Sequence, residues 1–442
     1  MFETDSQTPK DLQIFPSAKG AQAVISIFDE VASFGGKYKL DELFRRPLSD
    51  PQDIRDRTEY IQYIENNRLT LKIERDALDF IEYYLKLYKI PSRYSYIDGI
   101  RRYWADKIKP DNEYYIITRA IKWLVEIIQG LYDFANDEAC ETSPVLMRSF
   151  SDTIHRILDS DDFEPAMRHK RKRLSIQEIT RFDHIFRYRR RDDIRALLDI
   201  IYQIDVFQSV ISVKNKLGFV FADIKNGQCL NFEGLYHPLL QDPVPNDMLM
   251  QESRIGFITG ANMAGKSTFM KAFGISLYLA HMGFPVPARK MEFSVFDGLF
   301  SSINVPDDLS LGYSHFYAEI KRIKSIAEKV SSGKKYVVIL DELFRGTNVK
   351  DAHEATVTVI RSFGNARRSL FLFSTHILEV AEELGQTMTG NILFRYFKTD
   401  IDGKQLKYSY KMHEGISEDR FGMHILKMEG IEELLMKSNP NE

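Results

Sequence analysis

Residues Ile255–Thr268 read I-G-F-I-T-G-A-N-M-A-G-K-S-T and carry the pattern G-x-x-x-x-G-K-[ST]. An apolar, strand-like run (255–259) precedes the glycines, and an apolar helical run (266–281) follows them. Because glycines let backbone N–H groups turn toward phosphate oxygens at the start of a helix, this context predicts a phosphate-binding loop. We expect Lys266 to reach the β- and γ-phosphates and Ser267 to ligate Mg²⁺.

After this loop, short β-branched and aromatic runs alternate with helical stretches. The expected strands are Val295–Ile303, Tyr336–Leu340 and Leu370–Phe373, and the expected helices are Leu309–Ser331, Ala352–Ser362 and Ile377–Leu384. Such alternation is typical of a mainly parallel sheet with helices on its faces. Asn391–Lys398 and Leu406–Met412, joined through Asp402–Gly403, predict a closing β-hairpin.

An acidic pair, Asp341 and Glu342, follows the second expected strand. We expect Asp341 to hold Mg²⁺ through water and Glu342 to orient or deprotonate an attacking water molecule. The hexapeptide Leu-Asp-Glu-Leu-Phe-Arg occurs twice, around this pair and at 40–45. The copy at 40–45 follows no apolar run, so we expect it on a solvated helix face. His376 follows the third expected strand and is a candidate sensor of the γ-phosphate, although a lone histidine is more often structural.

The N-terminal half of the chain has helical periodicity. Its clearest stripe runs through 196–213, where apolar residues recur at three- and four-residue steps. Similar stripes occupy 54–73, 78–90 and 116–132. We therefore expect three parts: a polar N-terminal segment at 1–20, a helical domain at 21–217 and a strand–helix domain at 218–442.

The composition of the 442 residues is that of an ordinary globular protein, with a formal net charge of −3. This balance argues against a polyanion-binding arm, so any nucleic-acid surface has to be a local patch. The two cysteines, Cys140 and Cys229, lie far apart and form neither a C-x-x-C zinc motif nor a disulfide framework, which favours a reducing compartment. No uncharged stretch is long enough to span a bilayer. We expect a cytoplasmic protein without membrane association.

One run of sequence is strongly basic. Ten lysines and arginines lie between residues 168 and 191, with Phe182, Phe186 and Tyr188 interleaved. Basic and aromatic side chains together suit phosphate contact and base stacking. The candidate nucleic-acid patch is Arg168, Lys170, Arg171, Lys172, Arg173, Arg187, Arg189, Arg190 and Arg191. A solvated helix face is an equal alternative for this run.

The segment Asp307–Glu319 reads D-D-L-S-L-G-Y-S-H-F-Y-A-E and resembles the signature loop of the MutS family of DNA mismatch-repair ATPases. Further segments are similar to motifs of the same family: Thr259–Thr268 to its phosphate-binding loop, Val286–Ala288 to its V-P-A motif, Phe421–His424 to its F-G-I-H motif, and 43–57 and 198–218 to the two ends of its core domain.

The chain departs from the family pattern at four positions. Ala261 and Ala264 replace a usual proline and a usual glycine, and His315 replaces the threonine beside the signature serine. Pro243 stands where the family often has an aromatic residue against adenine, which leaves the packing of the base open.

The resemblance implies an α plus α/β protein. An all-helical core and lever domain (21–217) would be followed by a P-loop ABC-type ATPase domain (218–442) with a mainly parallel sheet and C-terminal dimerisation helices. It implies ATP and Mg²⁺ as cofactors and a homodimer formed through the ATPase domain. Candidate nucleotide-binding residues are Gly260, Ala261, Asn262, Met263, Ala264, Gly265, Lys266, Ser267, Thr268 and His424, with Ser314 acting in trans. The candidate catalytic residues are Glu342, Lys266 and His376, and the candidate metal ligands are Ser267 and Asp341.

The leading hypothesis is an ATP-hydrolysing dimer that binds double-stranded or branched DNA and moves its helical arms in DNA repair or recombination. Because the chain begins almost at the core, we expect no mismatch-recognition domain and no classical mismatch recognition. The alternative is a nucleotide-switched protein-interaction module of the ABC ATPase class without direct DNA contact.

Overall fold

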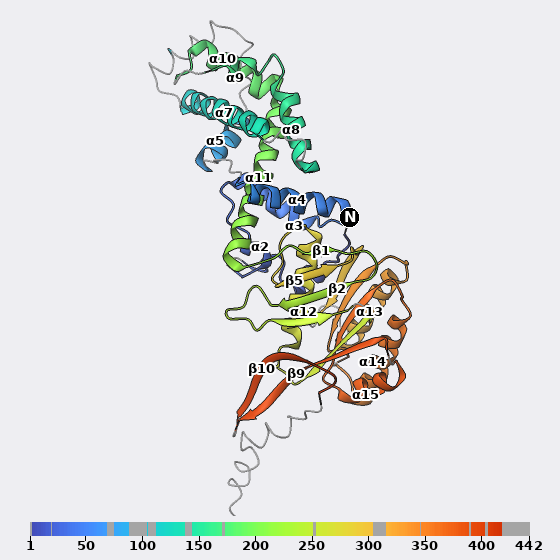
Figure 1. Ribbon diagram of the computed structural model, residues 1–442. Helices are drawn as coiled ribbons and strands as arrows, with labels where there is room; N and C mark the ends of the chain where they lie inside the picture. The colour runs from blue at the N-terminus through green and yellow to red at the C-terminus, as the bar shows by residue number, and fades with distance from the viewer. Residues whose placement is uncertain are drawn as a thin grey trace, which may run out of the picture. The chain divides into compact units, whose positions relative to one another are not determined.

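The structure is a computed structural model, and it describes residues 2–18, 20–68, 75–87, 104, 112–137, 144–169, 173–250, 253–303, 315–344, 346–388, 390–402 and 405–417. The chain divides into two compact units (Figure 1). Unit 1 comprises residues 1–26, 46–54 and 217–442, and unit 2 comprises 27–45 and 55–216. Each unit is described by itself.

The main sheet of unit 1 has six strands in the order β10-β9-β4-β8-β7-β6. The strands are β4 (Ile255–Gly260), β6 (Gly298–Ser302), β7 (Tyr336–Asp341), β8 (Leu370–Ser374), β9 (Ile392–Asp402) and β10 (Gln405–Glu414). All neighbouring pairs are parallel except β9 and β10, which form the closing hairpin. The predicted mainly parallel sheet and its hairpin are confirmed.

Helices cover both faces of this sheet. They are α12 (Lys266–His281), α13 (His315–Val330), α14 (Val349–Gly364) and α15 (Leu378–Thr387). Side chains alternate between the faces of a strand, and Val338 of β7 belongs to the core shared with α13, α14 and α15. The next residue, Ile339, lies on the other face beside Gly274 of α12. The two-sided burial explains why the strands read as uninterrupted apolar runs.

A second, four-stranded sheet in unit 1 was not predicted. Its order is β1-β5-β2-β3, formed by β1 (Asp223–Ile224), β2 (Leu230–Leu235), β3 (Asn246–Leu249) and β5 (Lys290–Phe293). These strands are short, and β2 contains Gly234 at a positive φ of 64°. Short strands with a glycine carry a weak alternation signal, which accounts for their absence from the sequence-based expectation.

The expectation of a separate polar segment at 1–20 is wrong. Residues 1–26 belong to unit 1, and Phe2, Leu12 and Ile14 are buried there. The short helices α1 (Thr8–Asp11) and α2 (Val24–Ile27) lie in this stretch. The segment contains too few apolar residues for a periodic pattern, yet those few are the ones that pack.

His281 ties another sequence-distant piece, 46–54, into unit 1. The N–H group of Leu48 donates to the carbonyl oxygen of His281 at 2.7 Å, and Nδ1 of His281 lies 2.8 Å from the carbonyl oxygen of Leu48. The N–H group of Phe296 donates to Nε2 at 3.3 Å. These partners require a neutral ring with its proton on Nδ1, and complete burial lowers the pKa of His281 to about 4.

The described elements of unit 2 are all helical. They are α3 (Phe34–Arg45), α4 (Pro51–Asn66), α5 (Arg75–Leu85), α7 (Asn112–Asp137), α8 (Val145–Leu158), α9 (Glu164–Met167), α10 (Ile176–His184), a π-helical turn η1 (Ile185–Arg189) and α11 (Arg191–Leu217). Within the described residues, α11 is long and apolar enough to cross a membrane, and 67% of its apolar window is buried inside the protein. It therefore serves as a core helix of this unit, as its apolar stripe predicted.

The two copies of the hexapeptide occupy different environments, as expected. Asp41 and Glu42 lie on α3 with their side chains 44% and 46% exposed, paired with Arg45 and Lys39. The other acidic pair, Asp341 and Glu342, is buried at the end of β7. The preceding apolar strand, and not the hexapeptide itself, accounts for the difference.

Candidate active site

The stretch between β4 and α12 has the backbone of an anion-binding loop. Gly260, Met263 and Gly265 have positive φ angles of 135°, 67° and 111°. A Cβ atom on Gly260 would lie 2.9 Å from the carbonyl oxygen of Phe397, so only glycine fits at this position. Gly265 immediately precedes the first residue of α12 and provides no side-chain cap. The loop therefore leaves the first N–H groups of α12 without a side-chain cap, as anion binding at a helix start requires.

Three predicted catalytic side chains come together at the carboxyl ends of neighbouring parallel strands. Nζ of Lys266 donates to the carbonyl oxygens of Gly260 (2.9 Å) and Ala261 (3.1 Å), and it lies 3.3 Å from Oε1 of Glu342. Nδ1 of His376 lies 3.6 Å from Oε2 of Glu342. Lys266 follows β4, Glu342 follows β7 and His376 follows β8. Ligands of open parallel sheets bind at this edge.

Glu342 is held in a strained conformation. Its φ is 45°, which side-chain-bearing residues rarely adopt. Its N–H group donates to the carbonyl oxygen (3.1 Å) and the hydroxyl (3.2 Å) of Ser374 at the end of β8. Such strain persists only where the surroundings impose it, and it aims the carboxylate at Lys266 and His376.

Asp341 has the features of a metal ligand acting through water. The hydroxyl of Ser374 donates to Oδ1, while Oδ2 is buried without a hydrogen-bond partner among the described residues. The described part of the chain holds no cluster of three or more His, Cys, Asp or Glu side chains suited to a metal ion. One carboxylate and one hydroxyl, from Ser267, nevertheless fit Mg²⁺, which keeps several waters and takes further ligands from phosphate.

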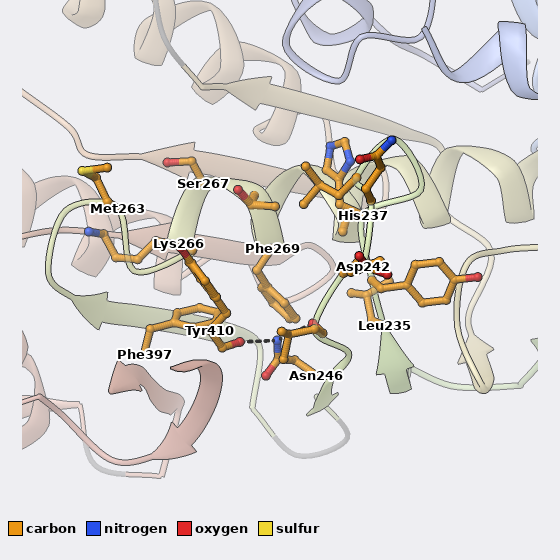
Figure 2. A pocket seen from close by; sticks show the side chains of 18 of the residues that line it. Leu235, His237, Asp242, Asn246, Met263, Lys266, Ser267, Phe269, Phe397 and Tyr410 are labelled. Atoms are coloured by element: carbon orange, nitrogen blue, oxygen red, sulfur yellow. Dashed lines mark hydrogen bonds between the residues drawn. The ribbon is translucent and has the colours of Figure 1, made fainter. Parts of the chain in front are cut away.

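A pocket of about 470 Å³ adjoins this cluster. Figure 2 shows Met263, Lys266 and Ser267 on one side and Leu235, His237 and Asp242 on the other, with Phe269 between them and with Phe397 and Tyr410 on the side of Lys266. Asn262, Thr268 and Glu342 also line it. A polar, cationic end next to an aromatic wall suits a ligand with a phosphate chain and a flat ring.

The aromatic wall was missed by the sequence interpretation. Pro243, the departure from the family pattern, does line the pocket, and the rings of Phe397 and Tyr410 lie there as well. A Cβ atom on Gly265 would lie 3.5 Å from Cδ1 of Tyr410 and 3.6 Å from Cε1 of Phe397, so both rings approach the loop. The predicted hairpin was the available signal, but its register could not be read from the sequence.

Asn246 fixes the position of Tyr410. Its side-chain amide donates to the carbonyl oxygens of Val244 (3.1 Å) and Tyr410 (3.0 Å), and its Oδ1 accepts from the N–H group of Met412 at 2.7 Å (Figure 2). The pairing of β10 with β9 shifts register between Tyr408 and Met412, and Tyr410 has a φ of 54°. The bulge interrupts the regular alternation of side chains between the two faces of β10, so the direction of the Tyr410 side chain does not follow from its position in the strand.

His237 is a neutral member of the pocket. Burial lowers its pKa to about 4, with a smaller contribution from the positive charge of Lys271. Its Nδ1 accepts a hydrogen bond from the N–H group of Leu239 at 3.3 Å. At neutral pH it therefore presents an uncharged imidazole to a ligand.

Some predicted residues lie outside the described part of the chain. They are Ser314, His424, the C-terminal segment 418–442 expected to hold dimerisation helices, and Lys170, Arg171 and Lys172 of the basic run.

The rest of the basic run is largely neutralised within unit 2. Arg187 is buried, and its Nε and Nη2 atoms donate to the carboxylate of Asp183 at 2.6 and 2.5 Å. Its inclusion in a DNA-contacting patch is therefore wrong. Burial works against the charged form of Arg187, but the bonds to Asp183 outweigh it and raise its pKa further.

Acidic residues before the basic run pair with three of its other arginines. Arg189 and Arg190 both contact Asp162, at 2.8 and 2.7 Å, and Arg168 contacts Glu164 at 2.6 Å. Arg191 donates to the carbonyl oxygen of Leu85, and Arg173 is exposed. The positive potential around the run is therefore weaker than its ten basic residues suggest.

A family model described as MutS domain V matches residues 256–441. This match includes the strand ends and side chains of the cluster described above. Over residues 256–441 the chain is thus similar to the MutS family. MutS domain V is the ATPase domain of that family, and the fold of unit 1 is consistent with it.

Similar curated proteins carry the same name. "DNA mismatch repair protein MutS" of Persephonella marina is 32% identical over 241 residues, covering 53% of this chain and 27% of that protein. Its namesakes from Brevibacillus brevis (30% over 244 residues) and Lactococcus lactis subsp. lactis (29% over 252 residues) are covered over 28% and 30% of their lengths. The similarity thus spans less than a third of these MutS proteins. The N-terminal segment 1–26 and strands β1 to β3 lie outside the MutS domain V match.

Proposed function

We propose that this protein is an ATP hydrolase that works as a homodimer through its MutS domain V and couples ATP turnover to movement of its helical unit in DNA repair. Unpaired, buried Cys229 is in keeping with a cytoplasmic location. The observation that carries the proposal is the buried contact between Lys266 and Glu342 beside an uncapped helix start.

Lys266 is positioned to bind the phosphates of a nucleotide. Its ammonium group contacts two carbonyl oxygens and a carboxylate. A triphosphate would replace these partners, because phosphate oxygens are stronger partners for an ammonium ion than carbonyl oxygens. The released carboxylate of Glu342 would then be available to accept a proton from water.

Mg²⁺ would be held by Ser267 and, through water, by Asp341, and it would neutralise charge on the phosphates. His376 is about half exposed at the edge of the cluster. From that position it can donate a hydrogen bond to an oxygen of the terminal phosphate. Glu342, Lys266 and His376 thus act as base, phosphate ligand and phosphate sensor.

Glu342→Gln tests the proposal, because it removes the base while keeping the shape. General-base catalysis contributes about 10²- to 10⁴-fold, so turnover should fall by that factor while ATP binding persists. Glu42→Gln in the exposed copy of the hexapeptide is the matched control and should leave hydrolysis unchanged. Wild-type turnover in the Glu342 variant would exclude its role as the base.

Double-stranded or branched DNA is the proposed partner, and the support for it is that the similar proteins are named DNA mismatch repair proteins. The extensive pairing of the basic run favours the alternative, a nucleotide-switched protein-interaction module, because few of its described arginines are left for phosphates. Affinity for plain, mismatched and branched duplexes, with and without ATP at two salt concentrations, separates the two. DNA binding weakens steeply with salt, so absence of any salt-dependent binding would remove DNA from the function.

A further inference from the structure

Unit 2 contains a cleft of about 460 Å³ that is lined by residues of α3, α5 and α11. Every lining residue belongs to unit 2, whereas the residues of the candidate active site belong to unit 1. Phe34, Tyr38 and Glu42 follow one another at four-residue intervals on α3, as Asp79 and Tyr83 do on α5. Residues four apart lie on the same side of a helix, so each of these helices turns one continuous face toward the cleft.

Three aromatic side chains of this lining are exposed, at 79% for Tyr38, 57% for Tyr83 and 55% for Phe34. The core contacts of α3 are made by another face of the helix, on which Leu40 and Phe44 are buried. The core therefore does not account for the exposed rings. Exposed aromatic side chains gathered at one place are typical of a surface that binds a partner.

The base of the cleft is held by contacts between the three helices. A Cβ atom on Gly35 would collide with the ring of Tyr202, so glycine lets that ring lie against the backbone of α3. The hydroxyl of Tyr202 donates to Oε1 of Glu82 at 2.9 Å, and the N–H group of Phe34 donates to Oδ1 of Asp79 at 3.1 Å. Burial, followed by the charge of Glu82, raises the pKa of Tyr202, so its hydroxyl stays protonated and keeps donating. A cleft held in this way is largely preformed for a ligand.

The lining carries more negative than positive charge. Four carboxylates (Glu42, Asp79, Glu82 and Asp199) face two ammonium groups (Lys39 and Lys86), which leaves an excess of two negative charges. Lys39 pairs with Asp199 at 2.8 Å and with Glu42 at 3.2 Å, and Nζ of Lys86 lies 3.7 Å from Glu82. A carboxylate can accept about four hydrogen bonds, so Glu82 can bind a further donor beside these partners.

This combination of groups suits an organic cation. The described part of the chain holds no group of three or more His, Cys, Asp or Glu side chains that could bind a metal ion, so the carboxylates of the cleft are spread out. Their excess charge repels phosphate groups, which argues against DNA as the ligand. A guanidinium group binds carboxylates through paired hydrogen bonds and stacks on aromatic rings. Arginine is also enriched at the interfaces of proteins.

We propose that this cleft is a docking site for an arginine-bearing segment of a partner protein. Its guanidinium groups would bind the carboxylates of Asp79 and Glu82 and stack on the rings of Tyr38 and Tyr83. The docking site goes beyond the proposed ATP hydrolysis, because it lies in the other unit and needs no nucleotide.

The probe for the test is a fluorescent octapeptide of alternating arginine and glycine, whose affinity for the full-length chain is measured by fluorescence anisotropy without nucleotide. Tyr38→Ala and Tyr83→Ala should each raise the Kd by about 2- to 5-fold, because each removes one cation–π contact at an exposed site. The double variant Asp79→Asn/Glu82→Gln removes the excess negative charge and keeps an acceptor oxygen at each position. It should raise the Kd by about 2- to 30-fold.

Matched controls remove the same kinds of group elsewhere in unit 2. Tyr188→Ala removes another exposed ring, and Glu126→Gln/Asp192→Asn removes two other exposed negative charges. Both controls should bind the peptide like the wild type. A peptide with lysine in place of arginine should bind more weakly to the wild type, because an ammonium group forms no paired hydrogen bonds with a carboxylate.

Absence of binding of the arginine peptide to the wild type would overturn the proposal. An equal rise in Kd in the cleft variants and the controls would overturn it as well, because it would show attraction to the whole acidic surface. Sedimentation velocity tests a second copy of the chain as the occupant. If Tyr38→Ala/Tyr83→Ala dissociates a dimer that the wild type forms, a second copy fills the cleft and the proposal is wrong. An unchanged oligomeric state is the expected result.

Discussion

Replacing Tyr410 by alanine should weaken the binding of ATP without affecting its phosphate contacts. The ring lies at the aromatic wall of the pocket and is 46% exposed, so one face is available to a base. Stacking of a base on an aromatic side chain contributes about 1–3 kcal/mol. Because Tyr410 is only partly enclosed, we take the lower half of this range, about 1–2 kcal/mol, which corresponds to a rise in Kd of about 5- to 30-fold.

Calorimetric titration in a Glu342→Gln background measures this Kd without turnover. Tyr410→Phe keeps the ring and should bind like the parent. Tyr396→Ala, on the same hairpin but with its ring against His413 and outside the pocket lining, is the matched control.

Inorganic tripolyphosphate separates base packing from loop support. It has no base, so its affinity should be equal in the Tyr410→Ala variant and its parent. If tripolyphosphate binding weakens as much as ATP binding, Tyr410 acts by supporting Gly265, and the reasoning is refuted. An unchanged Kd for ATP would refute it as well.

Three further predictions concern stability. The pKa of His281 is lowered to about 4, below the ordinary value of about 6.5, so its contribution to stability is complete above pH 6.5 and is lost as the pH falls toward 4. Chemical denaturation should show that the wild-type protein loses about 2 kcal/mol more between pH 7 and pH 5 than a His281→Asn variant, which keeps the similar contribution of His237. Equal losses in the two proteins would contradict this. Arg187→Met removes the cation beside the buried carboxylate of Asp183, which keeps a hydrogen bond from the Tyr84 hydroxyl at 2.8 Å, and it should cost about 3–5 kcal/mol in the same assay. Adding Asp183→Leu should restore only part of this loss, because the Tyr84 hydroxyl then loses its acceptor. Gly298→Ala forces a methyl group against the backbone of Glu3 and should lower the Tm. Gly130→Ala, on α7 in open space, is the control and should not lower it. Equal melting temperatures for the two variants would count against the close approach of Glu3 to Gly298.

Local patterns predicted the elements around the active site. The run before Gly260, the run before Asp341 and the run before His376 are buried on both faces, so each reads as a strand without tertiary information. Parallel pairing then requires their carboxyl ends to meet at one edge, which is why the cluster could be anticipated.

Features that depend on sequence-distant partners could not be predicted. Tyr410 reaches the pocket through a bulge that Asn246 holds from another strand. Arg189 and Arg190 both pair with Asp162, which lies before the basic run. In each case the sequence shows the residue type, but only the folded structure shows which residue it contacts.

The N-terminal segment Phe2–Ile14, which contacts the edge strand β6, gives unit 1 an unusual order of assembly. Thr8 and Ser301, which are hydrogen-bonded, lie 293 residues apart in sequence. At typical rates of synthesis, residues 2–14 wait roughly 15 to 60 seconds for their binding site to emerge from the ribosome. All of unit 2 (27–45 and 55–216) is synthesised in that interval. Unit 2 can therefore fold first, and the edge of the main sheet is closed by a segment that was made long before it.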